Sequence, residues 1–226
     1  MLFRQLFDAQ TSTYTYLIAD ESTKEAVLVD PVIEQVERDY KLIKELGLNL
    51  YYCIETHIHA DHITAAYKLR KLTGCLGVVP AKAKVTCADI RIEEGDNLGV
   101  GGVNIEVIST PGHTSCHMAY LVGEDRVLTG DALFIRGCGR TDFQYGDIVT
   151  LYDSVMQNLF ILPDTTLVYP AHDYRGHTVS TIGEEKQFNP RLTGHTREEF
   201  ITLMNNIDKR NPKKIMEAVI ANEFTG

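Results

Sequence analysis

Several apolar runs of this chain each lead directly into a histidine or an aspartate, and this repeated arrangement limits the folds that the chain can adopt. The run over residues 50–54 leads into a segment that contains His57, and later runs lead in the same way to His113, Asp131 and His172. In sheets of α/β proteins, ligand sites lie at the carboxyl ends of strands. We therefore expect these polar side chains to meet at one edge of a sheet.

Strands and helices alternate along the chain. Strands are expected over residues 1–7, 14–19, 26–29, 50–54, 103–108, 126–129 and 166–169. Helices are expected over residues 34–46, 63–72 and 148–160, and a capping box at Thr196 opens another that runs to about residue 207. Because no linker of biased composition interrupts the pattern, we expect residues 1–226 to form a single domain, with residues 189–226 as a C-terminal extension packed on it.

Composition excludes several classes of protein. The net charge is -9, and no run of lysine or arginine forms the basic stripe that nucleic-acid binding needs. No stretch approaches the roughly 18 apolar residues that span a bilayer. The N-terminus resembles neither a secretory signal nor a transit segment, and five scattered cysteines argue against a disulfide framework. We expect a bacterial cytoplasmic protein, or a mitochondrial matrix protein from which a transit segment has been removed.

The densest group of polar residues lies just after the strand at 50–54. His57, His59, Asp61 and His62 place four ligand-type side chains within six positions, which indicates a metal site. Cysteine is absent from this group, so the pattern excludes a thiolate-rich structural zinc site and leaves catalytic coordination of zinc, iron or manganese. The isolated histidines elsewhere are expected to be ordinary surface or hydrogen-bonded residues; these are His117, His177 and His195.

The segment from Thr56 to His62 resembles the signature of the metallo-β-lactamase superfamily, and His113, Asp131 and His172 follow in the order and at roughly the spacings of that family. The resemblance covers about residues 10–180. It implies an α/β fold, an αββα sandwich of two mixed sheets packed face to face with helices outside. The metal would lie at one edge between the sheets.

Within the superfamily, the chain is most similar to the persulfide dioxygenases (sulfur dioxygenases), typified by the mitochondrial ethylmalonic encephalopathy protein. The motifs that carry this similarity are Asp61-His62-Ile63-Thr64, Gly137-Cys138-Gly139-Arg140-Thr141-Asp142-Phe143-Gln144, Asn189-Pro190-Arg191-Leu192 and Asn211-Pro212-Lys213-Lys214-Ile215. Glyoxalase II, which shares the Gly-Cys-Gly-Arg core, usually has glycines after the histidine that His62 matches. It also has a longer helical domain after the residue that His172 matches.

The resemblance implies one Fe(II) per chain, held by His57, His113 and Asp131 as the catalytic residues. The enzyme would oxidise glutathione persulfide with O₂ and water to sulfite and glutathione. The remaining donors would orient the ligands and bound water, or hold a second metal; these are His59, Asp61, His62 and His172. The set of candidate ligands alone does not distinguish a site with one iron from a site with two zinc ions. The resemblance is also compatible with a homodimer.

Substrate contacts are expected from Arg140, Tyr174 and Arg175. Tyr174 matches a glutathione-contacting tyrosine of the hydrolase branch, and Arg140 can pair with a carboxylate of glutathione. Lys213 and Lys214 fit a solvated face better than a binding site. Cys138 either relays sulfur near the metal or packs as a small residue between two glycines, and packing is favoured.

Two rival functions remain open at this stage. One is a glyoxalase II-like thioester hydrolase with two zinc ions acting on S-acyl glutathione. The other is a metal-binding sensor or interaction protein without catalysis, although an intact set of ligands argues against it.

Overall fold

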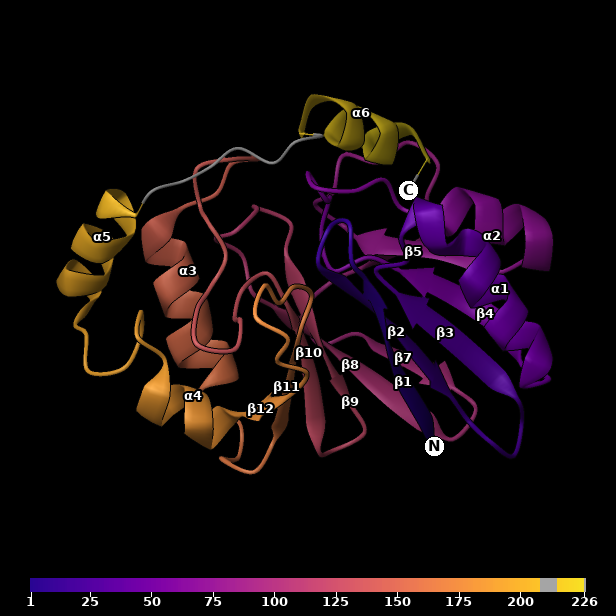
Figure 1. Cartoon of the computed structure of the whole chain (residues 1–226), viewed down its shortest axis with the longest axis horizontal. Helices are drawn as coiled ribbons and strands as arrows, with labels where there is room; N and C mark the ends of the chain where they lie inside the picture. The colour runs from indigo at the N-terminus through magenta and orange to yellow at the C-terminus, as the bar shows by residue number, and fades with distance from the viewer. Residues whose placement is uncertain (208–214, 226) are drawn as a thin grey trace.

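The computed structural model describes residues 1–207 and 215–225. Two six-stranded sheets pack face to face, and helices cover the outer face of each sheet (Figure 1). This arrangement is the αββα sandwich expected from the sequence, and the expected fold class is confirmed.

The first sheet has the strand order β1-β2-β3-β4-β5-β6. Its strands are β1 (Leu2–Asp8), β2 (Thr13–Ala19), β3 (Glu25–Val29), β4 (Asn49–Ile54), β5 (Leu76–Pro80) and β6 (Ile90–Ile92). The pairs β1/β2 and β2/β3 are antiparallel, whereas β3 through β6 run parallel. Parallel strands end at the same edge of a sheet, so β3 and β4 deliver the residues that follow them to one place.

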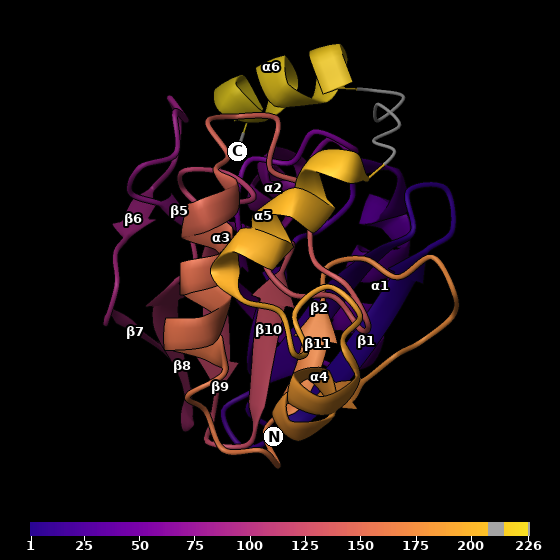
Figure 2. The same cartoon turned by 90° about the vertical axis from the view of Figure 1, so that its left-hand side faces the viewer.

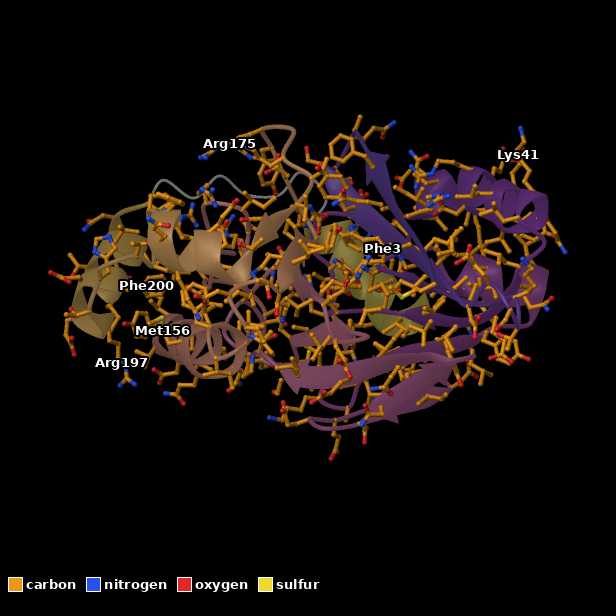
Figure 3. All side chains as sticks on the ribbon, turned by 90° about the horizontal axis from the view of Figure 1, so that it is seen from below. Phe3, Lys41, Met156, Arg175, Arg197 and Phe200 are labelled. Carbon is orange, nitrogen blue, oxygen red and sulfur yellow. The ribbon has the colours of Figure 1, made fainter. Side chains whose placement is uncertain are left out.

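The second sheet has the order β12-β11-β10-β9-β8-β7. Its strands are β7 (Asn97–Val100), β8 (Val103–Ser109), β9 (Met118–Val122), β10 (Arg126–Gly130), β11 (Leu167–Pro170) and β12 (Ser180–Thr181). Only β10 and β11 pair in parallel in this sheet. Side chains of both sheets fill the space between them, and Phe3 lies in this region near the middle of the molecule (Figure 3).

Helices α1 (Val36–Glu45) and α2 (Ala66–Thr73) pack on the first sheet, and a short 3₁₀ turn, η1 (Ile33–Gln35), precedes α1. Helix α3 (Ile148–Ser154) continues into the π turn η2 (Val155–Leu159) on the second sheet. Helices α4 (Ile182–Phe188) and α5 (Arg197–Asn206) lie beside α3 on the same outer face (Figure 2). Helix α6 (Ile215–Thr225) lies across the end of the sandwich (Figure 1).

Two details differ from the sequence predictions. Helix α2 begins at Ala66 rather than at residue 63, because Ile63 and Thr64 pair with the chain after β3. Several elements were not predicted, namely the short elements β5, β6, β7, β9, β12 and α4 and the 11-residue helix α6. The tail motif at Asn211–Lys214, including Lys213 and Lys214, lies outside the described residues. Within residues 1–207 and 215–225, every helix is too short or too polar to cross a membrane.

Candidate metal centre

Three side chains from three different strand ends form a compact group. His57 follows β4, His113 follows β8, and Asp131 follows β10 directly. Each offers one ligand atom, and these atoms all lie within 4.8 Å of one another. The group is largely shielded from solvent, with His57 only 1% exposed and Asp131 7% exposed. Three buried polar groups so close together are costly without a partner, and a cation bound between them removes that cost.

Hydrogen bonds orient both imidazoles of this group. Nδ1 of His57 lies 2.9 Å from the hydroxyl oxygen of Thr56. Nδ1 of His113 donates to the carbonyl oxygen of Arg140 at 2.6 Å, which fixes the tautomer and leaves Nε2 for a metal. That Nε2 lies 3.4 Å from Oδ2 of Asp131. Burial lowers the pKa of His57 well below its usual value, so its ring is neutral and able to ligate.

The carboxylate of Asp131 provides a direct test of whether a cation belongs here. Its Oδ1 is buried, and among the described residues it has no hydrogen-bond partner. A buried carboxylate oxygen without a partner is costly, and a bound cation would remove that cost. Two imidazoles and one carboxylate are also the donor set of non-heme iron sites with open coordination positions. The residues therefore fit the metal that the sequence implies.

His117 holds the backbone of Asp131 from behind. The N–H of Asp131 donates to Nε2 of His117 at 2.9 Å, and Nδ1 of His117 lies 2.8 Å from the hydroxyl oxygen of Thr110. The ring of His117 stacks on that of His57, with centroids 5.0 Å apart. Burial lowers the pKa of His117 well below its usual value, so it stays neutral and accepts this bond. We predicted His117 to be an ordinary surface or hydrogen-bonded residue, and its contact with Asp131 was not predicted.

His59 turns away from the first group. Its Nε2 lies 3.0 Å from Oδ1 of Asp30 and 3.2 Å from Oε2 of Glu55. Burial alone would lower the pKa of His59, but Asp30 and Glu55 raise it well above the usual value. Asp30 also accepts hydrogen bonds from the backbone and hydroxyl of Thr56. Neither carboxylate was predicted as a site residue, although Asp30 directly follows an apolar run, as the predicted residues do.

A second group lies beside the first. His59, Asp61 and His62 offer ligand atoms within 4.8 Å of one another, and Nδ1 of His62 lies 2.9 Å from Oδ2 of Asp61. His172 connects the two groups, because its Nε2 lies 3.5 Å from Oδ2 of Asp61 and 3.5 Å from Oδ1 of Asp131. The structure thus brings together all seven histidines and aspartates that were predicted from the sequence as candidate metal-site residues.

A cavity of about 220 Å³ opens onto these residues. Its lining includes four candidate metal-site residues, Asp61, His113, Asp131 and His172. It also includes the basic side chains of Arg140 and Arg191 and the apolar side chains of Phe134, Phe143, Met204 and Ile207. A cavity with apolar walls and a few polar groups at its base is typical of a small-molecule site.

The three expected substrate residues differ in their positions. Arg140 lines the cavity, with a bidentate pair to Asp142 at 2.7 Å and its guanidinium over the ring of Phe143. Tyr174 also lines it, 72% exposed, with its ring stacked on His172 at 6.1 Å. Arg175 is not part of the lining of this cavity. It lies on an exposed loop at the periphery of the molecule (Figure 3) and lines an adjoining hollow that shares His172 and Tyr174 with the cavity.

Comparisons with known proteins agree with this geometry. The sequence profile described as the metallo-beta-lactamase superfamily matches residues 9–172. The mitochondrial persulfide dioxygenase ETHE1 of Mus musculus is 50% identical over 228 residues, covering 100% of this chain and 89% of the mouse protein. The Homo sapiens protein of the same name is 49% identical with the same coverage.

The crystal structure of ETHE1 from Myxococcus xanthus superposes with a TM-score of 0.96 at 53% identity, covering 99% of this chain and 98% of that one. The chain belongs to the ETHE1 family of the metallo-beta-lactamase superfamily.

Residues of two motifs named in the sequence analysis, the segment from Gly137 to Gln144 and the segment from Asn189 to Leu192, form hydrogen bonds around the cavity. The Nε2 group of Gln144 donates to the carbonyl oxygen of Ile58 at 2.7 Å, which ties the loop after β10 to the metal-binding loop. Asn189 is fully buried and donates to the carbonyl oxygen of Gly137 at 3.0 Å. Arg191 donates to the carbonyl oxygen of Cys138. These contacts fix the position of Arg140, which follows in the same loop.

Cys138 is almost completely buried, although it contributes to the lining of the cavity. It is 1% exposed, its Sγ lies 3.9 Å from the sulfur of Met204, and burial raises the pKa of its thiol. A buried, protonated thiol is a poor nucleophile. The packing role that the sequence favoured for Cys138 agrees with this environment.

Helix α6 supplies a further residue of the site that sequence reasoning missed. Asn222 is 2% exposed, and its Oδ1 accepts from the backbone N–H of Thr64 at 2.8 Å. Its Nδ2 donates to the carbonyl oxygens of His59 at 3.0 Å and His62 at 2.9 Å. One side chain from the end of the chain thus satisfies three backbone groups of the metal-binding loop.

Proposed function

We propose that this chain is a non-heme iron persulfide dioxygenase that oxidises glutathione persulfide with O₂ and water to sulfite and glutathione. Its full-length relationship to persulfide dioxygenases at about 50% identity supports this activity. The observation that carries the proposal is the grouping of His57, His113 and Asp131, whose ligand atoms all lie within 4.8 Å of one another.

We assign these three residues as the ligands of one Fe(II) per chain. An iron ion held by these residues would supply the electron transfer between the persulfide and O₂, which zinc cannot supply. Nε2 of His59 is engaged by Asp30 and Glu55, and we assign His59 to the residues that orient the ligands and bound water. The second group, with Asp61 and His62, then serves to orient the neighbouring side chains and bound water.

The chain's own residues position the reactants. Thr56 and the carbonyl of Arg140 hold the two imidazoles in their tautomers. Nε2 of His172 lies 3.5 Å from Oδ2 of Asp61 and 3.5 Å from Oδ1 of Asp131, where the ring would orient both carboxylates. The net reaction takes two oxygen atoms of sulfite from O₂ and one from water, and the thiol of glutathione leaves.

Glutathione persulfide suits the cavity in charge and polarity. Glutathione carries two carboxylates, and the guanidinium groups of Arg140 and Arg191 both line the cavity. Tyr174 stands at an exposed position beside His172, where it can contact the peptide of glutathione. The rings of Phe134 and Phe143 shield the persulfide from bulk water.

We also propose that the protein resides in a reducing compartment, either the bacterial cytoplasm or the mitochondrial matrix. The five cysteines all occur as thiols in the structure, and a disulfide-free chain suits such a compartment. Homodimer formation stays a prediction.

An oxygen electrode distinguishes this function from its hydrolytic rival. The iron-loaded chain should consume O₂ when glutathione persulfide is added and should form sulfite in equal amount. The same preparation should not cleave an S-acyl glutathione thioester. Thioester cleavage without oxygen uptake, strongest in the zinc-loaded chain, would instead support a glyoxalase II-like hydrolase.

A further inference from the structure

Two thiols outside the metal centre lie in direct contact under helix α2. Cys53 belongs to β4, Cys75 directly precedes β5, and their sulfur atoms are 3.6 Å apart. Cys53 is fully buried, whereas Cys75 is 5% exposed. Cys75 also lines a surface hollow together with Arg70 and Asp89. The pair therefore consists of an inner thiol and an outer thiol that small molecules can approach.

The surroundings make the two thiols chemically unequal. The hydrogen bond from Cys53 lowers the pKa of Cys75 to about 7, and Thr73 and the Arg70 guanidinium act in the same direction against burial. The same hydrogen bond and burial raise the pKa of Cys53 well above its usual value. Cys75 is thus the thiol of the pair that ionises first, while Cys53 keeps its proton. The thiolate is the form that attacks a disulfide.

We propose that Cys53 and Cys75 form a redox-active dithiol that reacts with small disulfides such as oxidised glutathione and closes to an intramolecular disulfide. The thiolate of Cys75 attacks one sulfur of the disulfide RSSR, forming Cys75–S–SR and releasing RS⁻. Cys53 loses its proton, attacks the Cys75 sulfur and releases the second RS⁻. Two protein thiols are oxidised, one disulfide is reduced, and two RSH molecules result.

The geometry allows the second step with little movement. A disulfide requires a sulfur separation of about 2.05 Å, so the two sulfur atoms must approach by roughly 1.5 Å. Strands β4 and β5 are hydrogen-bonded neighbours, with Tyr52 paired to Leu76 and Cys53 to Gly77. Cys75 lies just before β5, so a shift of this residue together with rotation of both side chains would supply this closure while the strands stay paired. The site needs no metal and is independent of the proposed dioxygenase activity.

The test uses the full chain, reduced and then incubated with oxidised glutathione under nitrogen. Peptide mapping by mass spectrometry should find a Cys53–Cys75 disulfide in the wild-type protein, and dithiothreitol should reverse it. In the Cys53→Ala variant, glutathione should instead remain attached to Cys75, because the resolving thiol is gone. The Cys75→Ala variant should carry no glutathione at Cys53.

Cys87 lines the same hollow and provides the matched control. The Cys87→Ser variant should form the Cys53–Cys75 disulfide as the wild-type protein does. Alkylation of the reduced wild-type chain at pH 7 should modify Cys75 at least about tenfold faster than buried Cys138. The proposal is wrong if the wild-type chain retains glutathione on Cys75, or if oxidation joins Cys75 to Cys87. Equal alkylation rates at Cys75 and Cys138 would also overturn it, and these wild-type readouts hold even if a variant fails to fold.

Discussion

Asn222 binds the backbone of His62, which lies 160 residues earlier in the chain, through a hydrogen bond of 2.9 Å from Nδ2 to the carbonyl oxygen. Two further bonds, to His59 and Thr64, make this side chain the link between helix α6 and the metal-binding loop. The end of the chain is therefore part of the structure that positions the metal ligands.

Replacing Asn222 should loosen that loop. In the Asn222→Ala variant, three backbone groups lose their partner, and each buried group left unsatisfied costs about 1–3 kcal/mol. We expect lower iron content per chain and a lower kcat, measured by metal analysis and oxygen uptake, together with a lower Tm. Ile220→Ala on the same helix, at a side chain that is 54% exposed, should leave iron content unchanged. Equal iron contents in the two variants would contradict the assigned role.

Gly139 leaves no room for a side chain behind the metal centre. A Cβ at this position would lie 2.9 Å from Nδ1 of His113 and closer still to the carbonyl oxygen of Asp131. The Gly139→Ala variant should displace both residues and lose most of its iron. A Cβ at Gly99 would meet no atom within 4 Å, so Gly99→Ala is the matched control and should bind iron normally.

Arg140 should affect substrate binding more than chemistry. The Arg140→Lys variant loses the planar group that pairs with Asp142 and faces the cavity, and lysine does not replace bidentate contacts. We expect KM for glutathione persulfide to rise roughly tenfold, or about 1.4 kcal/mol, with kcat little changed. The matched Arg175→Lys variant, outside the cavity, should keep the wild-type KM. A KM increase in Arg175→Lys but not in Arg140→Lys would reverse the assignment.

Asp20 should make stability depend on pH in the acid range. Hydrogen bonds from the backbone of Gly102 and from Ser22 lower its pKa from 3.8 to about 2. Because the folded-state pKa lies below the unfolded value, this contribution is complete above pH 3.8 and is lost as the pH falls through 2. Urea unfolding should show wild type more stable than Asp20→Asn at pH 5, with the difference shrinking toward pH 2. A difference that does not vary with pH would contradict the shift.

The candidate metal ligands could be predicted from the sequence because they lie in short segments that follow the ends of strands. His113, Asp131 and His172 come from separate strand ends, and the sheet topology necessarily brings those ends together. The fold class followed from the same pattern together with the family resemblance. Gln144 and Asn189 were found as members of motifs, but their hydrogen bonds became visible only in the structure.

Other site residues could not be predicted because tertiary packing alone gives them their role. Asp30 was not predicted as a site residue, although its place after an apolar run was a usable signal. Glu55 and His117 carry no motif of their own, and their roles depend on burial beside His59 and Asp131. Asn222 reaches the site only because α6 folds back over the metal-binding loop, and spacing along the sequence does not encode that contact.

The most direct test is an iron titration of the metal-free chain under nitrogen, followed by oxygen uptake with glutathione persulfide. Activity should rise in proportion to bound iron and stop rising at about one iron per chain. His113→Ala should bind little iron and consume no oxygen, whereas Asp61→Asn should still bind about one iron. An activity that requires two metals per chain, or that zinc supports equally well, would contradict the account.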